Sequence, residues 1–204
     1  MFKTPNRHHS YGVGMTAEHL ISRAGAPLLT VVGQVRPDQL TSPTPCTGYD
    51  VRQLINHLLF WGPSLEGAGN KEAVPPPAEA ESAMDLTKGD WSGDLATQVQ
   101  RTIAAWTTSE AWQGTTRMAG PDELPSALIG GMVATELVVH GWDLGTATGQ
   151  QPSWDDEVLE YVHQEVAGHA EWGRQVGSYG PEVPVAATAP LLDRILGLTG
   201  RAVS

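Results

Sequence analysis

The sequence is poor in cysteine, in basic residues and in long apolar runs. Its single cysteine, Cys46, cannot form an internal disulfide, and a metal site would have to use histidine and carboxylate ligands. The chain has 12 Lys and Arg residues against 23 Asp and Glu residues, which gives a formal net charge of −11. We therefore expect no nucleic acid partner, because an acidic protein repels phosphates.

No apolar run approaches the roughly 18–20 residues that a membrane-spanning helix needs. Residues 1–14 also lack the apolar core of a signal peptide. We therefore expect a cytoplasmic protein without membrane contact. The length of 204 residues suits one buried core. Because residues 1–15 mix Pro, Gly, His and polar residues without periodicity, we predict a disordered extension followed by a single domain over residues 16–204.

Apolar residues recur at three- and four-residue spacing along most of the chain, which predicts an all-α protein with a four-helix bundle and two accessory C-terminal helices. The predicted helices cover about residues 16–35, 50–65, 90–106, 126–149, 151–173 and 191–201. Asp50 and Ser126 are the expected N-caps of the second and fourth helices. Residues 67–90 are polar and rich in Pro and Gly, which predicts a long surface loop. His163 and His169 are six residues apart and are predicted to lie on the solvated surface.

The segment from Leu128 to Gln150 places two ionisable side chains, Glu136 and His140, in a helix that is otherwise almost wholly apolar. A carboxylate buried there without a partner would cost several kcal/mol or would keep its proton, so a compensating group is expected. Residues four apart on a helix lie roughly 5–6 Å apart at Cβ, close enough to reach one metal ion. His57 flanks the apolar stripe of the second helix and is the expected third ligand.

Two histidines and one carboxylate leave one position of a tetrahedral zinc ion open, which is typical of a catalytic site. A metal-bound thiol would attack an electrophilic carbon, whereas metal-bound water would make a hydrolase. The same ligands suit non-haem iron(II), so an oxygenase stays open on chemistry alone.

Further residues have alternative interpretations. Asp143 lies three residues after His140, where it would orient a histidine or act as a base, or would instead pair with an arginine such as Arg52. Trp61 and Trp142 would either line a substrate pocket or pack in the core. We do not expect Cys46 to be a nucleophile, because no neighbouring basic residue lowers its pKa.

Two motifs carry a resemblance to a known family. The segments PTPCTGYDVRQLINHL and TELVVHGWDLGTATGQ resemble the DinB-like metal-binding four-helix bundles, and within them the N-terminal domain of mycothiol-dependent maleylpyruvate isomerase. A subgroup of stand-alone actinobacterial proteins that also has a GPEVPV-like loop before a short final helix is the most similar. The resemblance covers about residue 16 to the C-terminus. It implies that His57 of the NHL motif and Glu136 and His140 of E-x-x-x-H hold a metal, usually zinc.

The resemblance also implies a function. It points to a metal-dependent transferase or isomerase-like enzyme, a monomer or homodimer, that activates a low-molecular-weight thiol such as mycothiol for attack on a small electrophile. Zinc is the expected metal, with nickel or iron as alternatives. Because the isomerase has a second, C-terminal domain, this chain is expected to be too short to match it fully. A metal-dependent hydrolase and a non-catalytic metal- or ligand-binding protein stay open as alternatives.

Overall fold

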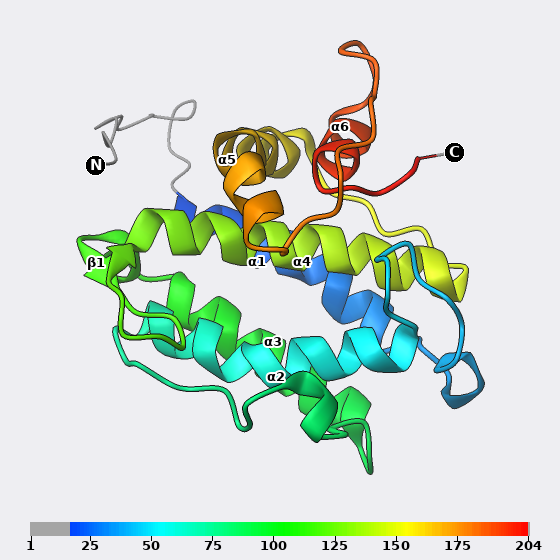
Figure 1. The fold of residues 1–204 in the computed structure, drawn as a ribbon, viewed down its shortest axis with the longest axis horizontal. Coiled ribbons are helices and arrows are strands. Elements are labelled where there is room, and N and C mark those ends of the chain that lie inside the picture. Colours follow the sequence, from blue (N-terminus) through cyan, green and yellow to red (C-terminus); the bar gives the residue numbers. More distant parts are fainter. Residues whose placement is uncertain (1–16, 204) are drawn as a thin grey trace.

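The computed structural model describes residues 17–203, and the prediction of a disordered extension over residues 1–15 lies outside this range. Six α-helices account for most of the described chain, which confirms the all-α prediction (Figure 1). They are α1 (Ala17–Val32), α2 (Val51–Gly69), α3 (Trp91–Trp106), α4 (Ser126–Thr148), α5 (Asp156–Gln175) and α6 (Leu191–Leu198).

The first four helices form the predicted bundle. Helix α4 packs against α1 and α2, and α3 packs against the same two helices. Helices α5 and α6 are the accessory helices, and Figure 1 shows them on the opposite side of α4 from α2 and α3. Three short 3₁₀ turns lie between the helices: η1 (Pro37–Gln39), η2 (Glu81–Ala83) and η3 (Ser109–Trp112). A two-stranded antiparallel pair, β1 (Thr115–Thr116) with β2 (Leu124–Pro125), precedes α4.

Helix α2 begins as the sequence predicts. The Asp50 carboxylate accepts a hydrogen bond of 2.8 Å from the Gln53 backbone N–H, and the Gln53 side chain accepts one of 2.9 Å from the Asp50 backbone. This reciprocal capping satisfies N–H groups that an uncapped helix leaves free. The buried face of α2 includes Leu54 and Ile55, and it leaves His57 at the edge of the core.

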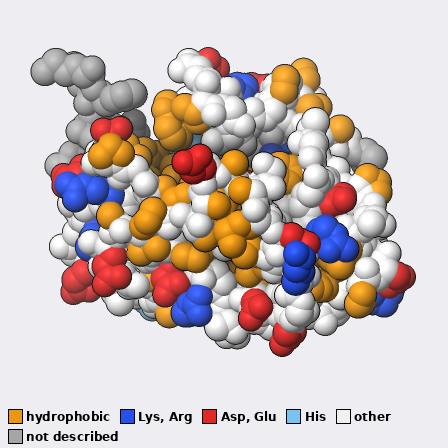
Figure 2. Space-filling view, turned by 60° about the horizontal axis from the view of Figure 1, so that its bottom comes forward, with side chains coloured by type: hydrophobic (Ala, Val, Ile, Leu, Met, Phe, Trp, Pro, Cys, Tyr) orange, Lys and Arg blue, Asp and Glu red, His pale blue; other side chains and the backbone are white. Residues whose placement is uncertain are grey.

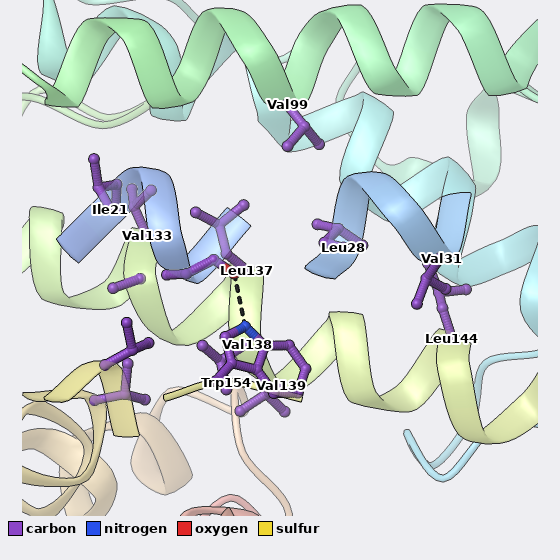
Figure 3. Close-up of a cluster of buried hydrophobic side chains, with 14 of the residues drawn as sticks. Ile21, Leu28, Val31, Val99, Val133, Leu137, Val138, Val139, Leu144 and Trp154 are labelled. Atoms are coloured by element: carbon purple, nitrogen blue, oxygen red, sulfur yellow. Dashed lines mark hydrogen bonds between the residues drawn. The ribbon is translucent and has the colours of Figure 1, made fainter. Parts of the chain in front are cut away.

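Helix α4 is the central element of the fold. Figure 3 shows its residues Val133, Leu137 and Leu144 among apolar side chains of α1, and all three are buried. The helix ends before Gly149, whose φ of 75° is a left-handed conformation that glycine adopts without strain. The prediction of Ser126 as its N-cap is wrong. Ser126 is the first helical residue, and its hydroxyl donates to the Gln113 carbonyl oxygen at 3.0 Å.

The surface prediction for His169 is also wrong. This side chain is buried, and its ring stacks on Tyr179 with 5.8 Å between ring centroids, whereas His163 is half-buried. Figure 2 brings the bottom of Figure 1 forward and shows apolar side chains among acidic and basic ones on this face. Within residues 17–203, no helix combines the length and the apolar character that crossing a membrane requires.

Candidate metal centre

The three predicted ligands meet where α2 faces α4. His57 comes from α2, and Glu136 and His140 come from α4. The Oε2 atom of Glu136 lies 3.5 Å from Nε2 of His57 and 3.1 Å from Nε2 of His140. One nitrogen or oxygen atom from each residue lies within 4.8 Å of the other two. The Glu136 side chain is 28% exposed, so this carboxylate faces a cavity and not the closed core.

The other nitrogen of His57 contacts a residue that the sequence did not single out. Nδ1 of His57 lies 2.9 Å from Oε1 of Glu81, in the 3₁₀ turn η2. The same carboxylate accepts hydrogen bonds from Nε1 of Trp61 at 2.7 Å and from the Tyr49 hydroxyl at 3.2 Å. An ionised carboxylate only accepts, so Nδ1 carries a hydrogen, and when the ring is neutral Nε2 carries the lone pair. Glu81 therefore turns the free nitrogen of His57 toward Glu136.

Asn56 is one of the α2 side chains that hold the loop carrying Glu81. Asn56 donates from Nδ2 to the Glu81 carbonyl oxygen at 3.3 Å, and its Oδ1 accepts from the Leu86 backbone N–H at 2.7 Å. The loop, residues 70–90, is thus held against α2 next to the site. Its composition predicted a surface loop, but one acidic residue of the loop turns inward.

His140 has a matching arrangement. Its Nδ1 lies 3.0 Å from Oδ2 of Asp143, which is fully buried. Nη2 of Arg201 donates to the same oxygen at 2.9 Å, and the Arg201 side chain is only 5% exposed. Asp143 therefore satisfies both interpretations of the sequence, because it contacts a histidine and an arginine. The arginine is Arg201 and not Arg52, which donates to the Thr87 hydroxyl at 3.1 Å.

The charges of this cluster shift the ionisation of its members. Burial disfavours the protonated form of His57, but hydrogen bonds to Glu136 and Glu81 outweigh this effect and raise its pKa to about 9. Burial alone would lower the pKa of His140. The charge of Glu136 and the hydrogen bond to Asp143 outweigh burial, so the pKa lies above its ordinary value. Burial of Glu136 is outweighed by the two histidines, which hold its pKa well below the usual range. The cluster therefore stabilises positive charge between its carboxylates.

Cys46 belongs to a second group of donor atoms, with His140 and Asp143. The Asp143 carboxylate is bound to Arg201, and Nη2 of Arg201 also lies 3.1 Å from Sγ of Cys46. Burial raises the pKa of the Cys46 thiol to about 11, against the opposing charge of Arg201. The thiol is therefore protonated near neutral pH, and this second group suits a metal less well than the first.

A cavity of about 500 Å³ opens onto His57, Glu136 and His140, within the range of small-molecule sites. Of the two tryptophans with alternative interpretations, Trp61 lines this cavity, whereas Trp142 does not line it and packs partly buried against the core. The other described residues of the wall include Cys46, Tyr49, Leu65, Glu81, Met118, Met132, Val176, Tyr179 and Arg201.

A larger cavity of about 670 Å³ lies next to it and shares Tyr49, Trp61 and Glu81 with it. Neither Glu136 nor His140 lines this second cavity. The smaller cavity is the candidate site, because it alone of the two contains the three donor groups.

Several known proteins are similar to this chain. Two uncharacterised proteins of Mycobacterium tuberculosis, from strains CDC 1551 and H37Rv, are each 28% identical to it over 185 residues, which is 89% of this chain and 95% of theirs. Crystal structures of mycothiol-dependent maleylpyruvate isomerase and of its histidine-to-alanine mutant match with TM-scores of 0.61 and 0.65 at 17% identity. Both matches cover 92% of this chain and 90% of the isomerase chain. The expectation that this chain is too short to match the isomerase fully is therefore wrong.

A protein-family model gives the same relationship as the structural matches. The family model described as the mycothiol maleylpyruvate isomerase N-terminal domain matches residues 21–145, which is more than half of the chain. This range contains α2 and most of α4, and with them His57, Glu136 and His140. The resemblance predicted from the two sequence motifs is confirmed, and the chain belongs to the mycothiol maleylpyruvate isomerase N-terminal domain family.

Proposed function

We propose that this protein binds one divalent metal ion through His57, Glu136 and His140 and transfers a small thiol of the mycothiol type to a small electrophile. One observation carries the proposal: both histidines direct Nε2 toward Glu136 while a carboxylate holds Nδ1. Histidines that bind a metal usually have such a carboxylate partner, which fixes the ring and its tautomer.

The distances between the donor atoms fit a metal ion. Two donors about 2.1 Å from a tetrahedral zinc ion lie about 3.4 Å apart. The two measured separations from Glu136 Oε2, 3.5 Å to His57 and 3.1 Å to His140, are close to this value. Zinc is the metal we propose, and nickel or iron would accept the same donors.

The charges fit as well. Glu81, Glu136 and Asp143 contribute three negative charges, and Arg201 contributes one positive charge. A metal ion on Nε2 takes the place of the proton of each histidine, so the histidines count as neutral and the group carries two negative charges, which one divalent cation balances. Such balance favours the metal, because buried charge without a counter-charge is costly.

The remaining residues give the site its chemistry. A divalent metal with an open position lowers the pKa of a bound thiol and so supplies a nucleophile near neutral pH. Glu81 and Asp143 orient the two histidines. Cys46 is the only cysteine of the chain and holds its proton, so it does not supply the thiol. The thiol therefore comes from solution, and the family name favours mycothiol.

The metal site is tested by elemental analysis of the purified protein. We expect close to one divalent ion per chain in the parent protein, and its loss in a His140→Ala variant. His163→Ala is the matched control, because His163 lies on α5 outside the candidate cavity. A parent protein without metal, or a His140→Ala variant with undiminished metal content, would exclude the site.

The reaction is tested with an electrophilic dye, with and without mycothiol. We expect conjugation that needs both the metal-loaded protein and the thiol. Hydrolysis of ester or amide substrates without thiol would support the hydrolase instead. Thiol binding without turnover of any electrophile would support a non-catalytic binding protein.

A further inference from the structure

We propose that the electrophile of this site is a neutral, largely apolar molecule and not a carboxylate; this inference rests on the proposed function. The side walls of the cavity carry the argument. Beyond the donor groups, the large side chains of the lining are mostly apolar or aromatic (Trp61, Leu65, Met118, Met132, Val176 and Tyr179), and the small polar ones are Thr47, Ser178 and Thr199. The large side chains bind apolar surface by the hydrophobic effect, and the hydroxyl groups offer an anionic group hydrogen bonds but no opposite charge to offset its lost hydration.

The arginine of the cavity is already engaged. Arg201 donates from Nε at 3.4 Å and from Nη2 at 2.9 Å to the two oxygens of Asp143. It also donates from Nη1 to the Thr199 carbonyl oxygen at 2.8 Å, and Nη2 lies 3.1 Å from Sγ of Cys46. A guanidinium binds a carboxylate best through two parallel N–H groups. In Arg201 these two groups already donate to Asp143, so they are not available to a ligand. Among the described residues that line the cavity, Arg201 is the one Lys or Arg.

The carboxylates of the site add to the effect. Glu81 and Glu136 both line the cavity, and a bound divalent ion neutralises the cluster without leaving positive charge over. A thiolate bound there would then give the part of the cavity next to His57, Glu136 and His140 a net negative charge. An electrophile with a carboxylate would bring a further negative charge next to it, whereas a neutral electrophile meets no such repulsion.

The transfer step needs no charge on the electrophile. The thiol sulfur forms a bond to the electrophilic carbon, and the bond from that carbon to its leaving group breaks. The electron pair of the broken bond departs with the leaving group, and the thiol proton passes to solvent. For an aryl chloride the leaving group is chloride. A neutral aromatic ring would pack against Trp61 and Tyr179 during this step.

Binding is tested with a matched pair of unreactive molecules, dinitrobenzene and dinitrobenzoate. The metal-loaded protein is saturated with mycothiol and titrated with each by calorimetry. We expect the neutral molecule to bind at least about tenfold more tightly, because the carboxylate finds no free cation. Equal binding, or tighter binding of dinitrobenzoate, would overturn the proposal.

A variant of the cavity lining strengthens this test. Val176 lines the cavity, is exposed, and is not one of the three donor groups. Val176→Arg adds a cation there and should reverse or abolish the preference, while Val176→Met should leave it unchanged. An unaltered preference in Val176→Arg would mean that charge does not determine the selectivity and would overturn the proposal.

Turnover separates this proposal from the proposed function. The reactive pair is chlorodinitrobenzene and chlorodinitrobenzoate, with each rate divided by the uncatalysed rate with the same thiol. Faster turnover of the neutral molecule supports both proposals. Catalysis of both molecules without preference overturns the inference alone. Absence of thiol-dependent turnover overturns the proposed function, and the binding titration still decides the selectivity.

Discussion

Asp143 connects the candidate metal centre to the C-terminal segment, and replacing it by asparagine separates its two roles. Asp143→Asn keeps the size of the side chain but removes its charge. Arg201, whose side chain is 5% exposed, would be left as a buried cation without its anion. Breaking a buried ion pair in this way costs about 3–5 kcal/mol. Because a domain of this size loses about 2–4 °C per kcal/mol, we expect the metal-free protein to unfold about 6–20 °C lower.

The same substitution should weaken metal binding. Asp143 accepts the hydrogen bond from Nδ1 of His140, and loss of such a partner typically lowers metal affinity about 10–100-fold. Urea unfolding in the presence of a chelator measures the stability, and chelator competition measures the affinity. The two effects separate in a double variant: Arg201→Met removes the uncompensated charge, so it should restore part of the stability of Asp143→Asn without restoring metal affinity.

The matched control is Asp38→Asn. Asp38 forms an ion pair of 3.2 Å with Arg36, but both side chains are exposed, so the loss should be below about 1 kcal/mol. A stability loss in Asp143→Asn no greater than that of the control would refute the buried-pair reasoning. Unchanged metal affinity would refute the role of Asp143 in orienting His140.

Three further substitutions test other parts of the structure. Glu81→Gln should weaken metal affinity about tenfold in chelator competition; unchanged affinity would exclude a role in orienting the histidine ring. Burial raises the pKa of Glu165 to about 7, so ionisation destabilises the folded state as the pH rises above the unfolded value near 4.3. Glu165→Gln should therefore gain about 1–3 kcal/mol over the parent at pH 8 and little at pH 4, and a pH-independent difference in urea unfolding would contradict this. Gly130→Ala places a Cβ against the Trp112 ring and should cost about 1–3 kcal/mol, whereas Gly168→Ala meets open space and should not destabilise; equal effects would contradict the packing.

Much of the fold follows from local patterns. The capping residue Asp50, the terminal Gly149 and the apolar spacing place α2 and α4 close to their observed bounds. The end of α2 was less predictable, because GAGN resembles a loop, yet the helix continues to Gly69. The reason is tertiary: Trp106 of α3 donates to the Leu65 carbonyl oxygen at 2.9 Å, and a Cβ at Gly69 would collide with its ring. A glycine that permits close packing is indistinguishable in sequence from one that permits a turn.

Some residues of the candidate site were likewise predictable from local sequence patterns, and others were not. Glu136 and His140 were predictable because they interrupt an apolar helix, and Asp143 because it follows at helical spacing. The burial of His169 also follows from helical spacing, because His169 continues the buried stripe of Val158, Val162 and Val166. Glu81 had no such signal, because an acidic residue in an irregular loop usually faces solvent. It turns inward because Asn56 holds the backbone of its loop and because Trp61 and Tyr49 donate to its carboxylate.

The two histidines therefore differ in how their positions are secured. His140 is held by Asp143 from the same helix, three residues away, and its side chain is 9% exposed. His57 is held by Glu81 from a loop 24 residues away, and its side chain is 20% exposed. The α4 half of the site therefore depends on one helix and on Arg201 of the C-terminal segment, which binds Asp143. The α2 half is complete only when the 70–90 loop packs against it, so disturbing the loop should alter metal affinity through His57 before it alters global stability.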